Sequence, residues 1–336
     1  MKIDCAKLKS ALEIVKPGLA NREFIDQSTS FAFLDGKVVT YNDEISISHP
    51  LEGLDINGAV AADSLYKFIS KVKKDELEMD VNSNEILFSS GRMKASLALQ
   101  TQIKLPLRET IVENPWHDLP SDFNASLNFA VAVCGKASGL ILSSVHITED
   151  GLIESSDSFR IIRCSLLHPL PVKSFLLPSN LVATVVKLNP VSISEGRGWI
   201  HFKTEKDTII SCRTFKDEYP DIDKHLRVKG INLTFPENIE DVLERASVFA
   251  KRDNIMTESI TILLMDGLLK VYSRAEGFNG WFEEEMDFDY KGKDIKFFIT
   301  PSLLKDILKT TNSCVLSESK LKFEGEGWEF VTVLRG

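Results

Sequence analysis

The chain has 336 residues, 43% of them hydrophobic and 26% charged, and its formal net charge at pH 7 is −9. Because single hydrophobic cores stop growing near roughly 250–300 residues, this length predicts two or three domains. No apolar run reaches the roughly 18 residues of a membrane span, and an early acid, Asp4, argues against a secretory signal, so we expect a cytoplasmic protein without membrane contact. The acidic balance excludes a surface that is basic throughout, so any contact with nucleic acid must be local.

The cysteine pattern indicates neither disulfides nor a metal site. The five cysteines are widely spaced, without a C-x-x-C pair or a histidine at metal-ligand spacing: Cys5, Cys134, Cys164, Cys212 and Cys314. We therefore expect reduced, mostly buried thiols and no metal or other cofactor.

In chain order, the first third contains a helix at about 6–16, ended by Pro17-Gly18, then a hairpin signal at Asp35-Gly36 and a helix capped by Asp63. Alternating strands follow near 77–88. The same order recurs with a helix at 124–138, Asp150-Gly151 and a cap at Ser179. It recurs again with a helix at 237–252, Asp266-Gly267 and a cap at Thr300.

These signals predict a threefold internal repeat. The glycines at 36, 151 and 267 lie 115 and 116 residues apart. An isolated Asp-Gly turn is common in any β-rich protein, but three in constant register with three helices favour a triplication. We predict an α+β fold of three repeated domains, each with two helices on antiparallel sheets, at 1–115, 116–228 and 229–336.

Basic residues gather in the six predicted helices. These segments hold fourteen basic and six acidic residues, a net charge of +8, which leaves −17 for the remainder of the chain. Charged helix faces are usually plain solvated surface, but segregation over three repeats favours one shared basic surface facing DNA. The fourteen are Lys7, Lys9, Lys16, Lys67, Lys71, Lys73, Lys74, Lys136, Lys187, Arg245, Lys251, Arg252, Lys305 and Lys309. Contacts of this kind bind the duplex backbone without sequence preference.

Several short motifs, in order and at family spacing, resemble those of the bacterial and phage DNA polymerase sliding clamps, the DNA polymerase III beta subunit family. The resemblance covers nearly the full length. It rests on Met1-Lys2-Ile3 with Leu8–Leu12, Ser90-Gly91-Arg92 leading into Ala95-Ser96-Leu97, Ser156-Asp157-Ser158-Phe159-Arg160-Ile161 with Cys164, Tyr219-Pro220-Asp221, and the C-terminal Phe330–Arg335.

The resemblance implies a head-to-tail homodimer whose six similar domains close a ring around duplex DNA, with helices lining the hole. Such a ring leaves no exposed sheet edge. By family position, the dimer contact joins Ala95 and Leu97 to Val248 and Phe249, and Arg22 is a further DNA contact.

The resemblance also implies an apolar pocket that binds short peptide motifs of a replicative polymerase and a clamp loader. Two departures, Ser158-Phe159 in place of the usual Gly-His and the ending Thr332–Gly336 in place of Met-Pro-Met-Arg-Leu, suggest partners unlike the common bacterial ones. An ordinary last strand and a surface ion pair of Arg160 are the alternatives. The pocket residues by family position are Leu142, Ser156, Arg160, Ile161, Pro220, Lys224, His225, Phe330, Thr332, Val333, Leu334 and Arg335.

No catalytic signature is present in the sequence. It lacks a P-loop, G-x-G-x-x-G, G-x-S-x-G and H-E-x-x-H, and its six histidines are scattered. We expect a DNA polymerase processivity factor without catalytic residues of its own. The alternatives are an open, monomeric DNA-binding or scaffold protein of the same fold, which would stay monomeric in solution, and a hydrolase, which would show turnover after purification.

Overall fold

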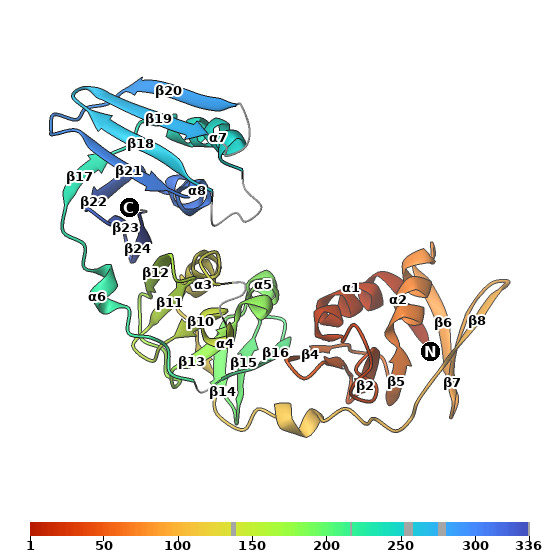
Figure 1. Cartoon of the computed structure of the whole chain (residues 1–336). Helices are drawn as coiled ribbons and strands as arrows, with labels where there is room; N and C mark the ends of the chain where they lie inside the picture. Colours follow the sequence, from red (N-terminus) through yellow and green to blue (C-terminus); the bar gives the residue numbers. More distant parts are fainter. Residues whose placement is uncertain (136–138, 216, 252–257, 275–279, 335–336) are drawn as a thin grey trace. The chain divides into compact units, whose positions relative to one another are not determined.

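The computed structural model describes residues 1–135, 139–215, 217–251, 258–274 and 280–334. It divides into two compact units. Figure 1 draws and labels their helices and strands. The first unit comprises residues 1–128, 147–151 and 167–217, and the second comprises residues 129–146, 152–166 and 218–336. Helix α3 (Phe123–Val131) and strand β10 (Ser144–Ile147) cross the division. None of the described helices is long and apolar enough to cross a membrane.

The first unit contains two antiparallel sheets. The smaller has the order β1-β6-β7-β8, and the larger has the order β5-β2-β3-β4-β16-β15-β14-β9. Its elements are β1 (Lys2–Asp4), α1 (Cys5–Val15), η1 (Lys16–Gly18), β2 (Ser30–Leu34), β3 (Lys37–Tyr41), β4 (Ile45–Pro50), β5 (Gly58–Ala61), α2 (Ala62–Lys71), β6 (Glu76–Val81), β7 (Glu85–Ser90), β8 (Met93–Ala98), η2 (Leu107–Thr110), β9 (His117–Asp118), β13 (Phe175–Pro178), α5 (Ser179–Leu188), β14 (Ser192–Glu195), β15 (Trp199–Lys203) and β16 (Ile209–Arg213).

The second unit repeats this organisation. Its smaller sheet has the order β20-β19-β18-β21, and its larger sheet contains the run β10-β11-β12-β24-β23-β22-β17. Its further elements are α4 (Gly139–Leu142), β11 (Leu152–Ser156), β12 (Arg160–Ser165), α6 (Asp223–Leu226), β17 (Ile231–Thr234), α7 (Ile239–Ala250), β18 (Ile260–Met265), β19 (Leu268–Arg274), β20 (Trp281–Asp287), β21 (Ile295–Ile299), α8 (Pro301–Leu308), β22 (Ser313–Leu316), β23 (Lys320–Gly325) and β24 (Trp328–Val333).

The strand orders display the repeat. The order β5-β2-β3-β4 in the first unit matches β21-β18-β19-β20 in the second. In both, the first strand of the hairpin, β2 or β18, pairs with the strand that precedes a helix, β5 before α2 or β21 before α8. A second pattern occurs as β1-β6-β7-β8, β9-β14-β15-β16 and β17-β22-β23-β24. The α+β class and its repeated organisation are therefore confirmed. The domain boundaries at 115/116 and 228/229 remain a prediction, because the two compact units do not follow them.

The hairpin turns follow from local backbone preferences. Asp35 and Gly36 both have positive φ, 51° and 68°, as a two-residue turn between β2 and β3 requires. Gly267 has φ 71° in the turn between β18 and β19. Helix α1 ends at Val15 and continues as the 3-10 turn that contains Pro17, as predicted.

The predicted helix starts were less accurate. Asp63 and Ser179 lie inside α2 and α5, whose N-cap positions are Ala61 and Pro178, so both predicted caps are wrong. Thr300 occupies the N-cap position of α8, but its hydroxyl donates to the Glu258 carbonyl at 2.9 Å instead of capping the helix. These helices follow directly from strands, and pairing in the sheet positions the chain without a side-chain cap.

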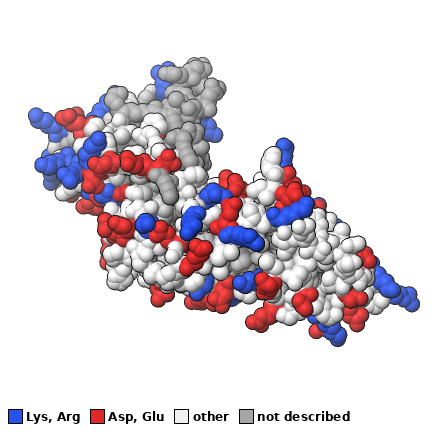
Figure 2. Space-filling view, turned by 90° about the horizontal axis from the view of Figure 1, so that it is seen from below, with Lys and Arg blue, Asp and Glu red and all other residues white. Residues whose placement is uncertain are grey.

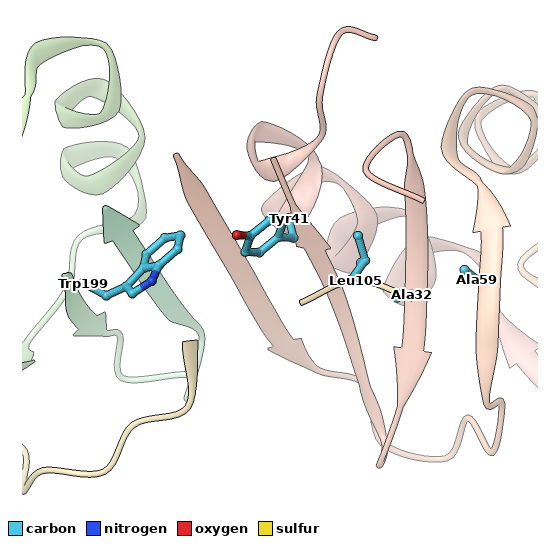
Figure 3. Close-up of a cluster of buried hydrophobic side chains, with 5 residues drawn as sticks. All are labelled: Ala32, Tyr41, Ala59, Leu105 and Trp199. Carbon is cyan, nitrogen blue, oxygen red and sulfur yellow. The ribbon is translucent and has the colours of Figure 1, made fainter. Parts of the chain in front are cut away.

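A buried cluster joins the first and second repeats inside the first unit. It comprises Ala32, Tyr41, Ala59, Leu105 and Trp199. Figure 3 shows the rings of Tyr41 and Trp199 facing each other from two strand segments, with centroids 5.9 Å apart. Arg213 lies over Trp199 at 4.4 Å and bonds Asp43 at 2.7 Å. The pairing of β4 with β16 thus makes one continuous sheet from two repeats.

Candidate functional site

A cavity of about 270 Å³ lies on one face of the larger sheet of the second unit. Its walls are mainly apolar side chains of β12, β24 and the segment before and within α6, with polar groups among them. The lining residues are Leu142, Ser156, Ser158, Phe159, Ile161, Pro220, Asp221, Ile222, His225, Lys320, Val331 and Val333.

Strand register explains the apolar floor. Strand β12 pairs antiparallel with β24, so that Ile161 lies opposite Val331. Side chains of directly paired residues project on the same face of a sheet. Val333 donates its backbone N–H to the Phe159 carbonyl at 2.9 Å, which extends this row to the next position. Ile222, which precedes α6, and Leu226, at its end, pack on Val331, and Ile222 also lines the cavity.

A tight turn presents Phe159 at the cavity. The Asp157 carboxylate accepts the backbone N–H groups of Phe159 and Arg160, both at 3.0 Å. Ser158, which lies between Asp157 and Phe159, has a backbone φ of 75°, a conformation that residues other than glycine seldom adopt. The Phe159 side chain is 39% exposed. The turn therefore presents an aromatic side chain at the cavity.

Arg160 points away from this cavity. Its guanidinium bonds Asp157 and the Ala132 carbonyl, each at 3.0 Å, and lies 3.6 Å from Asp306. It does not line the cavity. Arg160 therefore makes an ion pair, as one alternative from the sequence proposed, but the pair with Asp157 is largely buried, since both side chains are 14% exposed.

Six of the twelve predicted pocket residues line the cavity, namely Leu142, Ser156, Ile161, Pro220, His225 and Val333. Of the others, Phe330 and Thr332 are buried on the opposite face of β24, because consecutive strand residues alternate between faces. Arg160, Lys224 and Leu334 lie outside the lining, and Arg335 lies outside the described residues. The sequence reasoning missed Ser158, Phe159, Asp221, Ile222, Lys320 and Val331. Strand alternation in 330–333 could have identified Val331.

The predicted concentration of basic residues within helices is weaker when the helix bounds of the structure are used. The described helices are shorter than predicted and contain eight basic and seven acidic residues, a net charge of +1 in place of +8. Several lysines follow the helix C-termini instead, such as Lys16, Lys251 and Lys309 at the C-cap positions. A cation is stabilised there by the helix dipole. Figure 2 shows acidic and basic residues interspersed on the face it draws.

The remaining basic charge concentrates in the α1–α2 pair. From α1 to Lys16 and from α2 to Lys74 there are seven basic and two acidic residues, a net charge of +5. Only two of these lysines pair with the two acids, Lys9 with Glu13 and Lys67 with Asp63, within the described residues. The predicted Lys7, Lys71, Lys73 and Lys74 are exposed.

The α7–α8 pair, in contrast, is neutral. From α7 to Lys251 and from α8 to Lys309 there are four basic and four acidic residues. Lys305 bonds Glu244 at 2.7 Å, which holds the pKa of that carboxyl below its usual value. Arg245 pairs with Glu284 of β20 at 2.7 Å. Of the other predicted DNA contacts, Arg22 and Lys187 are exposed, and Lys136 and Arg252 lie outside the described residues.

The predicted dimer residues lie on one sheet edge, Ala95 and Leu97 on β8, and on helix α7, which carries Val248 and Phe249 and contacts the edge strand β20. Strand β8, with half-buried Ala95 and Leu97, ends one small sheet, and β20 ends the other. Neither has a second neighbouring strand in the part of the chain that the structure describes. Val248 is 60% exposed, and Phe249 stacks on Phe282 of β20 at 6.1 Å. Trp281, 60% exposed at the start of β20, was not anticipated from the sequence.

All five cysteines are buried, as predicted. Burial raises the pKa of Cys134 and Cys314 to about 12. Among the described side chains, no group of three or more His, Cys, Asp or Glu could hold a metal ion.

Comparison with known proteins gives a match in fold. No protein-family model matches the chain, and no curated protein does. Among solved structures, the DNA polymerase III subunit beta from Pseudomonas aeruginosa superposes with a TM-score of 0.87 at 17% identity, covering 100% of this chain and 99% of that one. The beta chains from Streptococcus pneumoniae and Thermotoga maritima give TM-scores of 0.85 and 0.79, each at 17% identity, with 100% of this chain and 99% and 98% of those chains covered. Over its full length, the chain therefore has the fold of bacterial DNA polymerase sliding clamps.

Proposed function

We propose that the chain is a DNA sliding clamp, a non-catalytic processivity factor that encircles duplex DNA and holds a replicative polymerase. The full-length fold match to DNA polymerase III beta subunits carries this proposal. The cavity of the second unit supports it, because an apolar floor with a polar rim suits the anchor side chains of a short peptide motif. The polymerase and the clamp loader would bind there.

A head-to-tail dimer closes the ring in this proposal. The exposed edges of β8 and β20 offer unpaired backbone groups to a second copy. Their charges are complementary, since β8 carries Lys94 and follows Arg92, whereas β20 carries Glu283, Glu284, Glu285 and Asp287. Lys270 and Arg245 neutralise part of the acidic charge. The exposed Val248 and Trp281 would be buried in this contact.

Solution mass tests the ring. Light scattering at about 10 µM and after dilution should give two chains per particle, because an obligate ring needs the second copy to bury its edges. A stable monomer would instead favour the open, monomeric scaffold protein and overturn encirclement.

A processivity assay tests the cavity. Val333→Arg places a charged side chain in it, and we expect shorter extension products with the polymerase of the same replication system. Ile231→Arg, on β17 of the same sheet but outside the cavity, is the matched control. Equal product lengths for the two variants would exclude this cavity as the polymerase site.

A further inference from the structure

A charged cluster occupies the same sheet face as the cavity, one step further along the strands. Glu154 of β11 lies opposite Arg163 of β12, and Arg163 lies opposite Glu329 of β24. Ile161, two residues from Arg163, lies on the same face because strand side chains alternate. The apolar cavity floor and the charged cluster are therefore neighbours on one surface.

Glu154 is the centre of this cluster. It is 4% exposed, and both carboxylate oxygens are engaged. One accepts a hydrogen bond from Arg163 at 2.6 Å, and the other lies 2.9 Å from Nδ1 of His146. A buried carboxylate with these partners is stable in place, whereas loss of a partner would leave an uncompensated buried charge.

The segment Tyr219–Asp223 forms one wall of the cavity, and the two partners of Glu154 contact its two ends. The His146 ring stacks on Tyr219, with centroids 4.8 Å apart and planes at 20°. Arg163 donates to the Asp223 carboxylate at 2.6 Å and thereby lowers the pKa of that group. Between these two attachments lie Pro220, Asp221 and Ile222, which line the cavity.

The wall has little regular structure of its own. Helix α6 is a single turn, in which the backbone N–H groups of His225 and Leu226 reach the Ile222 carbonyl at 2.9 and 3.3 Å. Apolar contacts of Ile222 and Leu226 hold its C-terminal part on the sheet. The attachments of Tyr219 and Asp223 hold the two ends of the segment that lines the cavity.

We propose that Glu154, Arg163 and His146 are positioning residues for peptide binding, which fix the Tyr219–Asp223 wall over the cavity without touching the peptide. None of the three lines the cavity. The inference rests on the proposed function, because it requires that a peptide binds there.

The test uses the full chain and a probe selected for the cavity. A random dodecapeptide library is panned on the wild-type protein, and a peptide whose binding is lost in Val333→Arg but kept in Ile231→Arg is labelled for affinity measurement. The absence of any such peptide would overturn the peptide-binding part of the proposed function, and this inference with it.

With that peptide, Arg163→Gln and Asp223→Asn should each raise Kd by about tenfold, because each removes one of the two charges that strengthen the Arg163–Asp223 hydrogen bond. The double variant should be no weaker than Arg163→Gln, since that change already removes the contact with Asp223 as well as the one with Glu154. Lys322→Gln is the matched control. It removes ion pairs with Glu324 and Glu329 on the same face but makes no contact with the wall among the described interactions.

Hydrogen exchange separates positioning from general stability. We expect faster exchange at the amides of residues 219–226 in Arg163→Gln and Asp223→Asn, with little change in α7 and α8. Asp223 is exposed, so Asp223→Asn is expected to fold even if Arg163→Gln does not. A Kd within twofold of wild type in Asp223→Asn, or unchanged exchange over 219–226, would overturn the inference and leave the peptide site standing.

Discussion

The α1–α2 and α7–α8 helix pairs are alike in their apolar buried faces but differ in net charge. Each pair covers a sheet with an apolar stripe, but the first pair has a net charge of +5 and the second is neutral. The difference arises mainly within the helices, since α7 and α8 contain four acidic residues and α1 and α2 contain two. Glu284 of the neighbouring strand β20 neutralises Arg245 in addition. Basic residues in a helix thus indicate a basic surface only when neither the helix nor the elements packed beside it bring carboxylates that pair with them.

The largest expected effect is a loss of stability on core truncation, and it should be the same in both helix pairs. Leu12 of α1 and Leu243 of α7 are 0% exposed, and Leu12→Ala or Leu243→Ala should each lower the free energy of unfolding by about 2–5 kcal/mol through lost packing. A chain of several domains need not unfold in one step, so hydrogen exchange of the altered helix is the measurement. A loss under about 1 kcal/mol in one helix alone would show that the cores differ too.

The second effect should separate the pairs. The triple change Lys71→Ala, Lys73→Ala and Lys74→Ala should reduce the slope of log affinity for duplex DNA against log salt concentration by about 2 to 3, because each phosphate contact contributes roughly 0.9. Anisotropy with a labelled duplex at several salt concentrations measures this slope. The control triple Arg245→Ala, Lys251→Ala and Lys305→Ala should change it by less than about 1. Equal changes would contradict the comparison.

A smaller effect is expected when the α7–α8 pair is made more basic, like the α1–α2 pair. Glu244→Gln and Glu284→Gln release Lys305 and Arg245 from their ion pairs. Because two cations become available to phosphate, we expect the same salt slope to increase by at most about 2. An unchanged slope would mean that this helix pair does not approach DNA. Glu258→Gln, outside both pairs, is the control for the loss of a carboxylate.

The smallest effect concerns the packing between α1 and α2. Tyr66 donates to Glu13 at 3.0 Å, and its ring lies 4.2 Å from the Lys16 ammonium. Tyr66→Phe removes only the hydrogen bond, which for an exposed pair is worth roughly 0.5–1.5 kcal/mol. Exchange in α2 should therefore rise slightly, with the DNA salt slope unchanged. A large change in that slope would mean that Glu13, once released, affects the basic surface.

The candidate pocket was predictable in part. The segments that form it, near 156–161, 220–225 and 330–335, were identified by resemblance. On β24 the set was mixed, because a motif does not say which of two alternating faces meets the cavity. Val333 was identified, Val331 was missed, and Phe330 and Thr332 were included although they lie on the other face. Phe159 was noticed as a departure in sequence, but its place at the cavity depends on the turn made by Asp157 and the positive φ of Ser158.

The sequence by itself determined what depends on neighbours along the chain. The turn at Asp35-Gly36, the end of α1 near Pro17 and the repeat of about 115 residues all follow from backbone preferences and periodicity. Only the tertiary structure decided which charges are neutralised and which side chains share a surface. Ile161 meets Val331, and Arg163 meets Asp223, because strands and loops far apart in the sequence are brought together, and no local pattern specifies those distances.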